Sequence, residues 1–168
     1  MEKTKVRIDL ERQKDLQRLK AFRLMDDDFM NKFFDGDPVY IQLVLRIILG
    51  KADLVVIDVR TQVFIQNLLN RSVRLDVVAT DSQGRMYDIE IQRADDGAVP
   101  QRGRYLSSMM DVHQISQKGM AFKDLPEAWV IFITENDIYG KGRSLYRVER
   151  YIKADGIKYN DGSHIIYP

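Results

Sequence analysis

The chain of 168 residues contains no cysteine and only two histidines. Without cysteine it can form no disulfide, no thiol nucleophile and no zinc site built from thiolates. The histidines, His113 and His164, are isolated from each other in the sequence, so a histidine-rich metal site is excluded as well. A chain free of cysteine suits a reducing compartment.

The chain also lacks a strong net charge and long apolar runs. Lys and Arg number 26 against 25 for Asp and Glu, so no overall field attracts nucleic acid or a membrane. Any polyanion has to be bound by a local patch. No apolar run reaches the length of a membrane span, and the charged start MEKTKVRIDL lacks the core of a signal peptide. We therefore expect a cytoplasmic protein with one globular core and no membrane partner.

Two helices are predicted within this core, after a charged N-terminal arm or helix over residues 1–24. The first helix follows Asp37 as N-cap and ends at Gly50. Its apolar body is expected to be buried, with Gln42 and Arg46 forming a narrow polar stripe that faces solvent.

The second helix is predicted to begin near Pro100, with Tyr105, Met109 and Val112 recurring at helical spacing. Strands are expected where β-branched and aromatic residues concentrate. They are residues 52–59, 63–69, 73–80, 85–92, 129–134 and 145–152, with a final strand after the turn at 160–162. The run WVIFIT at 129–134 has the pattern of a strand covered on both faces.

The segment VRLDVVATDSQGRMYDIEIQR at 73–93 is predicted to form an antiparallel hairpin. If residues 82–84 form a three-residue loop with Gly84 in the left-handed conformation, Asp81 pairs with Arg85 and Asp76 lies opposite Glu90. One face is then apolar: Leu75, Val77, Ala79, Tyr87, Ile89 and Ile91. The other face carries Arg74, Asp76, Val78, Asp88, Glu90 and Gln92.

Carboxylates on that second face are unusual for a plain strand. Directly opposed Cβ atoms lie roughly 4.5–5.5 Å apart, so Asp76 and Glu90 would repel each other unless a cation lies between them. A hard divalent ion such as Mg²⁺ is the simplest candidate, because it is commonly held by one or two carboxylates and polarises phosphoryl oxygens. The alternative is the solvated face of an ordinary antiparallel sheet.

Three segments, RLDVVATDSQGRMYDIEIQR, RGRYLSSMMD and LPEAWVIFITENDIYGKG, resemble the PD-(D/E)XK nuclease family transposases. The resemblance runs from about Phe29 to the C-terminus. It implies a restriction-endonuclease-like α/β fold, with a central mixed sheet flanked by helices and a metal site where the central strands diverge. It also implies a DNA endonuclease associated with transposition or recombination, which uses Mg²⁺ or, in its place, Mn²⁺.

Position by position, the resemblance assigns the catalytic metal to Asp76 and Glu90, with the backbone carbonyl of Ile91 as a further ligand. Gln92 completes the catalytic set, and Asp88 is an auxiliary ligand or a support for its neighbours. Relatives continue beyond SHIIYP, which would make residues 25–168 a truncated nuclease-like domain. One site per chain favours a homodimer if both DNA strands are cut.

The chain departs from the superfamily pattern at two positions. Gln92 stands where the signature has Lys, and an amide orients water but cannot act as an ammonium group. Gln42 stands where relatives present an auxiliary Glu. Both departures favour the alternative function, a nuclease-fold module that binds DNA or a protein partner without cutting. A third hypothesis is a structural or oligomerisation domain with no nucleic-acid role.

DNA contacts are predicted on the second helix, at Arg102, Arg104 and Tyr105. Arginine forks suit phosphate oxygens, and residues three apart share a helix face. A charged helix start with a tyrosine packed at its edge is the alternative explanation.

Overall fold

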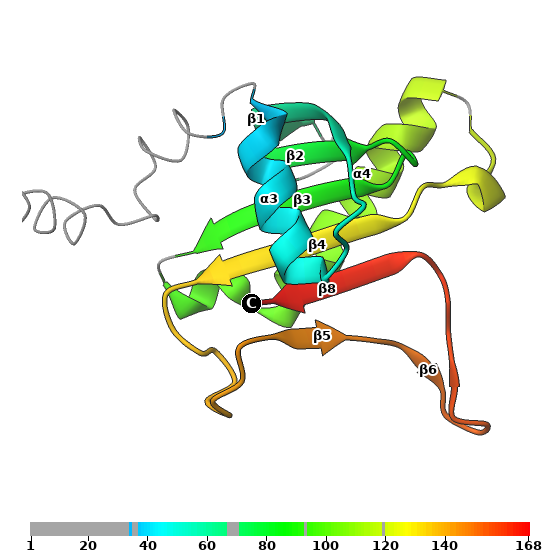
Figure 1. Ribbon diagram of the computed structural model, residues 1–168. Coiled ribbons are helices and arrows are strands. Elements are labelled where there is room, and N and C mark those ends of the chain that lie inside the picture. Colours follow the sequence, from blue (N-terminus) through cyan, green and yellow to red (C-terminus); the bar gives the residue numbers. More distant parts are fainter. Residues whose placement is uncertain (1–33, 35–36, 67–70, 93, 119) are drawn as a thin grey trace, which may run out of the picture.

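The structure, a computed structural model, describes residue 34 and residues 37–66, 71–92, 94–118 and 120–168. The predicted N-terminal arm over 1–24 lies outside the described residues. A six-stranded mixed sheet forms the centre, with strand order β1-β2-β3-β4-β8-β5 (Figure 1). Its strands are β1 (Val56–Ile65), β2 (Val73–Asp81), β3 (Met86–Gln92), β4 (Ala128–Thr134), β8 (Ser163–Tyr167) and β5 (Tyr146–Val148).

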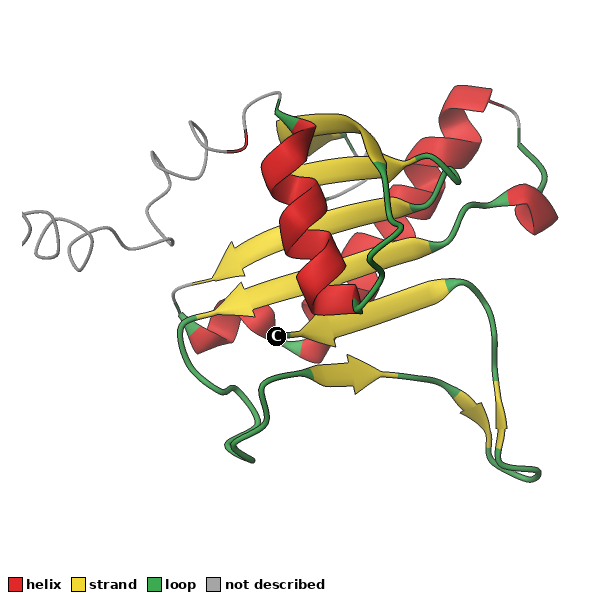
Figure 2. Ribbon diagram, viewed as in Figure 1, coloured by secondary structure: helices red, strands yellow, loops and turns green. Residues whose placement is uncertain are grey.

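Helix α3 (Pro38–Leu49) covers one face of the sheet and helix α4 (Pro100–Lys118) covers the other (Figure 2). Strands β3 and β4 run parallel, with α4 as the connection between them, and every other neighbouring pair except β4–β8 is antiparallel. The predicted class, mixed α/β with a central mixed sheet flanked by helices, is confirmed. None of the helices in the described ranges is long and apolar enough to span a membrane.

Helix α3 begins and ends where predicted, but the side that faces solvent differs from the predicted one. Asp37 Oδ1 accepts a hydrogen bond from Val39 N at 2.9 Å, and Gly50 has a left-handed backbone with φ 67°. The predicted polar stripe at Gln42 and Arg46 does not point to open solvent. Gln42 Oε1 accepts from Val56 N at 3.1 Å, and Arg46 Nε donates to Leu54 O at 2.8 Å. These side chains satisfy backbone groups of the segment that returns to β1.

The outward face of α3 is apolar instead. Val39, Leu43 and Ile47 are 62%, 56% and 72% exposed, and they recur every fourth residue. Buried residues of α3 occupy the neighbouring positions Ile41, Leu45 and Leu49, where they pack on the sheet.

The predicted hairpin register is confirmed. Asp81 N donates to Arg85 O at 3.0 Å, Gly84 has φ 80°, and Val77 pairs with Ile89. Leu75 is the exception to the predicted apolar face, because it packs in the core beneath α4 while Val77 packs beneath α3.

The exception has a local cause in β1. In place of the two predicted strands 52–59 and 63–69 the structure has one strand, β1, within which Gln62 has a left-handed backbone with φ 55°. The β1–β2 pairing passes from Thr61–Val77 to Val63–Leu75 without a pair at Asp76. The alternation of side chains changes phase at Asp76, although the register is the same on both sides of this gap and the ladder's register shift lies between Val56 and Asp58.

Helix α4 begins at Pro100 as predicted, and of the three spaced residues Met109 is buried and Tyr105 packs against the core. Val112 is 53% exposed, while Leu106 and Met110 are buried on the sheet. Gly103 lies where α4 approaches the sheet closely, because a Cβ there would lie 3.0 Å from Ile165 Cδ1 in β8. The predicted spacing therefore gave the helix, with Val112 as the one of the three residues that lies off the buried face.

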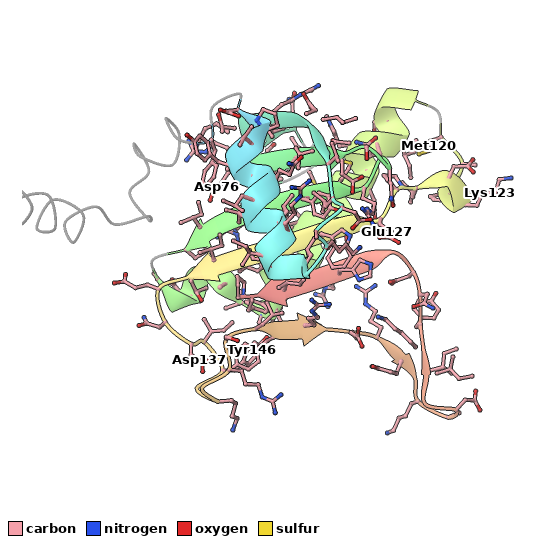
Figure 3. The ribbon with its side chains drawn as sticks, in the orientation of Figure 1. Asp76, Met120, Lys123, Glu127, Asp137 and Tyr146 are labelled. Atoms are coloured by element: carbon pink, nitrogen blue, oxygen red, sulfur yellow. The ribbon has the colours of Figure 1, made fainter. Side chains whose placement is uncertain are left out.

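The C-terminal third differs most from prediction. Strand β4 is buried along most of its length, as predicted for 129–134. The predicted strand 145–152 divides into β5, in the main sheet, and β6 (Tyr151–Ile152), which pairs with β7 (Ile157–Lys158) in a separate hairpin. At the start of β5, Tyr146 Oη donates to the carboxylate of Asp137 at 2.7 Å, and the two residues lie together in Figure 3.

Candidate metal and nucleic-acid site

Asp76, Asp88 and Glu90 meet where β2 and β3 separate. The β2–β3 ladder extends from Thr80–Met86 to Val77–Ile89 and stops before Asp76. Beyond it, Asp76 N donates to Glu90 Oε1 at 3.3 Å, and Ile91 N donates to Asp76 Oδ2 at 3.1 Å. Hydrogen bonds between side chains and backbone thus replace the ladder and hold the two predicted ligands together.

The carboxyl groups of Asp88 and Glu90 are fully buried. No N–H or hydroxyl group of the described residues donates to either oxygen of Asp88, and its neighbour is the carboxyl of Glu90. Burial raises the pKa of Asp88 well above its ordinary range, and the charges of Glu90 and Asp76 raise it further. Burial and then the charge of Asp76 raise the pKa of Glu90 to about 7. The cluster therefore holds more buried carboxyl groups than its donors can keep ionised without a further cation.

Arg102 and Gln92 cover Glu90 from the side of α4. An Arg102 guanidinium nitrogen is hydrogen-bonded to Glu90 Oε2, and Gln92 Nε2 donates to the same oxygen at 3.2 Å. The other terminal nitrogen of Arg102 donates to Gly97 O at 3.0 Å. A Cβ at Gly97 would lie 1.9 Å from Gln92 Oε1, so a side chain there would displace the Gln92 amide.

The donor set fits a hard divalent cation. Carboxylate oxygens are the ligands that Mg²⁺ prefers, and the unbalanced oxygens of Asp88 lie beside those of Glu90. No group of three or more His, Cys, Asp or Glu in the described part of the chain is arranged to hold a metal as it stands. At Glu90 the positive charge is supplied by the Arg102 guanidinium.

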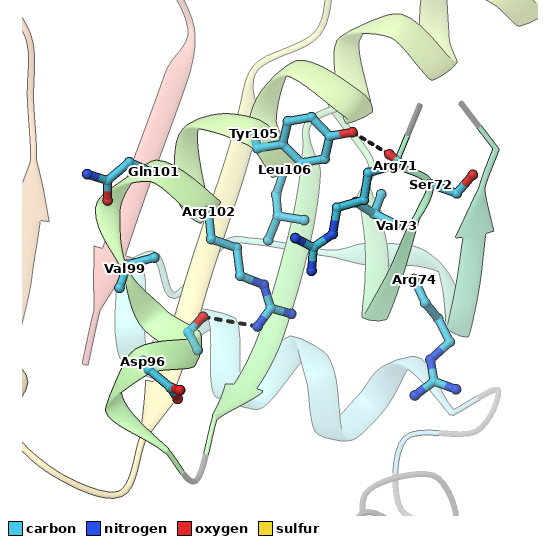
Figure 4. A pocket seen from close by; sticks show the side chains of 11 residues that line it. Arg71, Ser72, Val73, Arg74, Asp96, Val99, Gln101, Arg102, Tyr105 and Leu106 are labelled. Carbon is cyan, nitrogen blue, oxygen red and sulfur yellow. Dashed lines mark hydrogen bonds between the residues drawn. The ribbon is translucent and has the colours of Figure 1, made fainter. Parts of the chain in front are cut away.

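A cavity of about 770 Å³ opens beside this cluster, between the start of β2 and the first turns of α4 (Figure 4). In Figure 4 the guanidinium groups of Arg71 and Arg102 lie toward each other, whereas that of Arg74, another lining residue, points away from them. Tyr105 Oη donates to Arg71 O on the cavity wall. Its lining residues are Arg71, Ser72, Val73, Arg74, Asp96, Gly97, Val99, Gln101, Arg102, Tyr105 and Leu106.

Of the three predicted DNA-contacting residues, Arg102 and Tyr105 line this cavity. Arg104 is exposed and is not one of the lining residues, because it lies on the outer side of α4. Sequence reasoning missed Arg71 and Arg74 as binding candidates. Their only signal was two basic residues at the start of a strand, which is a common pattern.

Gln42 is not brought to the carboxylates. Its partner Val56 pairs with Asp81, at the hairpin-turn end of β2, whereas Asp76 lies near the middle of that strand. Its observed contact is the structural hydrogen bond to the start of β1.

Stability of the metal-free protein is expected to fall as the pH rises from about 4.5 to about 7. Between the ordinary glutamate pKa of 4.5 and the Glu90 pKa of about 7, the folded protein binds more protons than the unfolded chain. The stability that is complete below this window is therefore lost as Glu90 ionises. Urea unfolding in EDTA, from about pH 5 to about pH 8, measures the effect.

The Glu90→Gln variant is the control, because it keeps the shape of the side chain and removes its titration. His164 contributes the opposite slope, since burial lowers its pKa and stability then rises with pH. Subtracting the variant's curve from that of the wild type removes this contribution. Equal slopes for both proteins would contradict the prediction.

A mixed sheet with a helix on each face, and carboxylates where the central strands diverge, is consistent with a restriction-endonuclease-like, nuclease-type domain. The family model for the PD-(D/E)XK nuclease family transposase matches residues 27–167, and the chain belongs to this family. Comparison with curated proteins gave no match, and comparison with solved structures gave none.

Proposed function

We propose that the protein is a divalent-metal-dependent DNA endonuclease that hydrolyses phosphodiester bonds. The observation that carries the proposal is the cluster of buried carboxyl groups at the divergence of β2 and β3, in which both oxygens of Asp88 lack a hydrogen-bond donor among the described residues. Burying carboxylates without compensation is costly, so such a cluster is retained where a cation uses it. Family membership supports the same nuclease-type function.

In this proposal Asp76 and Glu90 hold Mg²⁺, or Mn²⁺ in its place, together with the backbone carbonyl of Ile91. Asp88 supports them as an auxiliary ligand. When bound, the ion supplies positive charge to a phosphoryl oxygen. Gln92 lies next to Glu90 and orients the attacking water through its amide.

DNA is bound in the cavity beside the cluster. Guanidinium groups of Arg71, Arg74 and Arg102 are suited to phosphate oxygens, and the ring of Tyr105 contributes an aromatic wall. We further propose that residues 25–168 form the nuclease domain. We also propose that it acts in the cytoplasm in transposition or recombination, and that it dimerises when both strands are cut.

A second candidate is a module of the same fold that binds DNA or a protein partner without cutting. Two observations favour it: Gln92 cannot supply an ammonium charge, and Arg102 already balances Glu90. The two functions differ in whether the carboxylates bind a metal.

Supercoiled plasmid incubated with the protein tests the proposal. We expect nicked circles with Mg²⁺ or Mn²⁺ and none with EDTA. Calorimetric titration with Mn²⁺ is expected to show binding that disappears in the Asp76→Ala, Glu90→Ala double variant. DNA binding without nicking and without carboxylate-dependent Mn²⁺ binding would instead support the non-cutting module.

A further inference from the structure

Arg102 lies between the carboxylate cluster and the arginine-lined cavity. One of its terminal nitrogens contacts Glu90 and the other contacts Gly97, while the side chain also lines the cavity. Resting on the proposed function, we propose that Arg102 is an exchangeable internal cation: it leaves Glu90 when a divalent ion binds and pairs with a nucleic-acid phosphate in the cavity. Metal binding and nucleic-acid binding are thereby coupled.

The Glu90 end shows why Arg102 has to move. Glu90 Oε2 accepts hydrogen bonds from both Arg102 and Gln92, and Oε1 accepts one from Asp76 N. A divalent ion that uses the same carboxylate would lie within a few ångströms of the guanidinium, and two cations at that distance repel strongly in a buried site. The ion and Arg102 therefore compete for Glu90.

The cavity offers Arg102 a second position. Arg71 and Arg74 form no ion pair with any described residue, and with Arg102 they supply three positive charges against one acidic lining residue, Asp96. The Arg102 side chain is 34% exposed, so it is accessible from the cavity. Phosphate oxygens suit such a cluster, because a guanidinium group binds them through paired N–H donors.

Coupling of this kind is reciprocal. A phosphate that holds Arg102 in the cavity leaves Glu90 free for the metal, and a metal on Glu90 leaves Arg102 free for the phosphate. By linkage, each ligand raises the affinity of the other by the same factor. A factor of roughly tenfold is typical of a coupling that involves one charged contact.

Calorimetric titration with Mn²⁺, without nucleic acid and at about pH 8, tests the competition at Glu90. The Arg102→Met variant is expected to bind Mn²⁺ roughly tenfold more tightly than the wild type. Arg104→Met is the matched control, because it removes the same charge from the same helix but from outside the cavity. Its Mn²⁺ affinity is expected to stay within about twofold of the wild type, since exposed charges are screened.

A short phosphorothioate oligonucleotide, which resists cleavage, tests the coupling. In the wild type the oligonucleotide is expected to raise Mn²⁺ affinity roughly tenfold, and Mn²⁺ to raise oligonucleotide affinity equally. In Arg102→Met both factors are expected to fall to about one. Arg74→Met is expected to weaken oligonucleotide binding but to preserve the coupling, because Arg74 lines the cavity and has no recorded contact with Glu90.

Three results decide the matter. Unchanged or weaker Mn²⁺ binding in Arg102→Met, or coupling that persists in it, would overturn the exchange while leaving the metal site in place. Absence of Mn²⁺ binding in every variant would overturn the proposed function itself and the exchange with it. If Arg102→Met fails to fold by circular dichroism, Arg102→Lys replaces it. Lysine keeps the charge but cannot bridge Glu90 and Gly97, so Arg102→Lys is expected to bind Mn²⁺ more tightly than the wild type. An Arg102→Lys variant with the Mn²⁺ affinity and the coupling of the wild type would equally overturn the exchange.

Discussion

Nicking of supercoiled plasmid is expected to fall by about a thousandfold or more when Asp76 or Glu90 is replaced by alanine. A thousandfold loss corresponds to about 4 kcal/mol of transition-state stabilisation, a reasonable value for the loss of a catalytic metal. Glu90 lies at the centre of the hydrogen bonds of the cluster, and Asp76 lies directly across from it. Initial rates of nicking in Mg²⁺ measure the effect.

The control for this loss is Asp58→Ala. Asp58 is a carboxylate on the neighbouring strand β1, exposed and paired with Arg60. Its removal is expected to leave nicking within about twofold of the wild type, because an exposed pair contributes little. Nicking that survives in both Asp76→Ala and Glu90→Ala would remove these residues from the mechanism.

A second large effect is expected on stability, from Asp81→Ala. Asp81 is fully buried at the start of the hairpin turn, and its carboxylate accepts hydrogen bonds from Arg85 Nε at 2.6 Å and Tyr87 Oη at 2.9 Å. It also accepts from the backbone N–H groups of Gln83 and Arg85, each at 2.9 Å. Breaking a buried ion pair by removing one partner costs about 3–5 kcal/mol, since the other partners remain buried and unsatisfied.

Urea unfolding of Asp81→Ala at neutral pH measures this loss. The same Asp58→Ala variant is the matched comparison, because it breaks an Asp–Arg pair of similar length, 2.9 Å, on the surface. Its free energy of unfolding is expected to change by about 0.5 kcal/mol or less. Equal losses in the two variants would show that burial does not set the contribution of Asp81.

Acid unfolding follows from the same contacts. Despite its burial, hydrogen bonds from Arg85 and Tyr87 hold the pKa of Asp81 below its ordinary value. Its contribution is therefore complete above the ordinary aspartate pKa and is lost as the pH falls through the lower, folded-state value. This slope is opposite in sign to that of Glu90, which loses stability as the pH rises.

The register of the hairpin could be predicted from residues that are close together in the sequence. Its register follows from a three-residue turn with Gly84 in the left-handed conformation, and from alternation of apolar residues along two adjacent strands. Both are short-range effects. That register places Asp76 opposite Glu90, so the pairing of the two predicted ligands could be read from the sequence.

The sequence could not predict the position in β2 at which side chains stop alternating regularly between the two faces of the sheet. Gln62 has a left-handed backbone in β1, and the β1–β2 ladder has no pair at Asp76. Leu75 consequently packs on the opposite face from the one that alternation predicts. The cause lies in a neighbouring strand, and a pattern within β2 alone holds no information about it.

The faces of both helices were likewise decided by packing. Apolar residues cover α3 on all sides, so the pattern could not tell which of them would meet the sheet. In α4, the small residue Gly103 permits close approach to β4 and β8 and so sets the buried face. Helical spacing identifies a helix, whereas its neighbours determine its orientation.

The sequence by itself determined the family resemblance, the hairpin register and the meeting of Asp76 with Glu90, because these depend on residues close together in the chain. The tertiary structure alone decided that Arg102 lies on Glu90 and that Arg71 and Arg74 face the same cavity. Those contacts join the start of β2 to a helix beyond β3 across the sheet. Charge and position in the chain say nothing about such a meeting until the sheet and α4 have packed together.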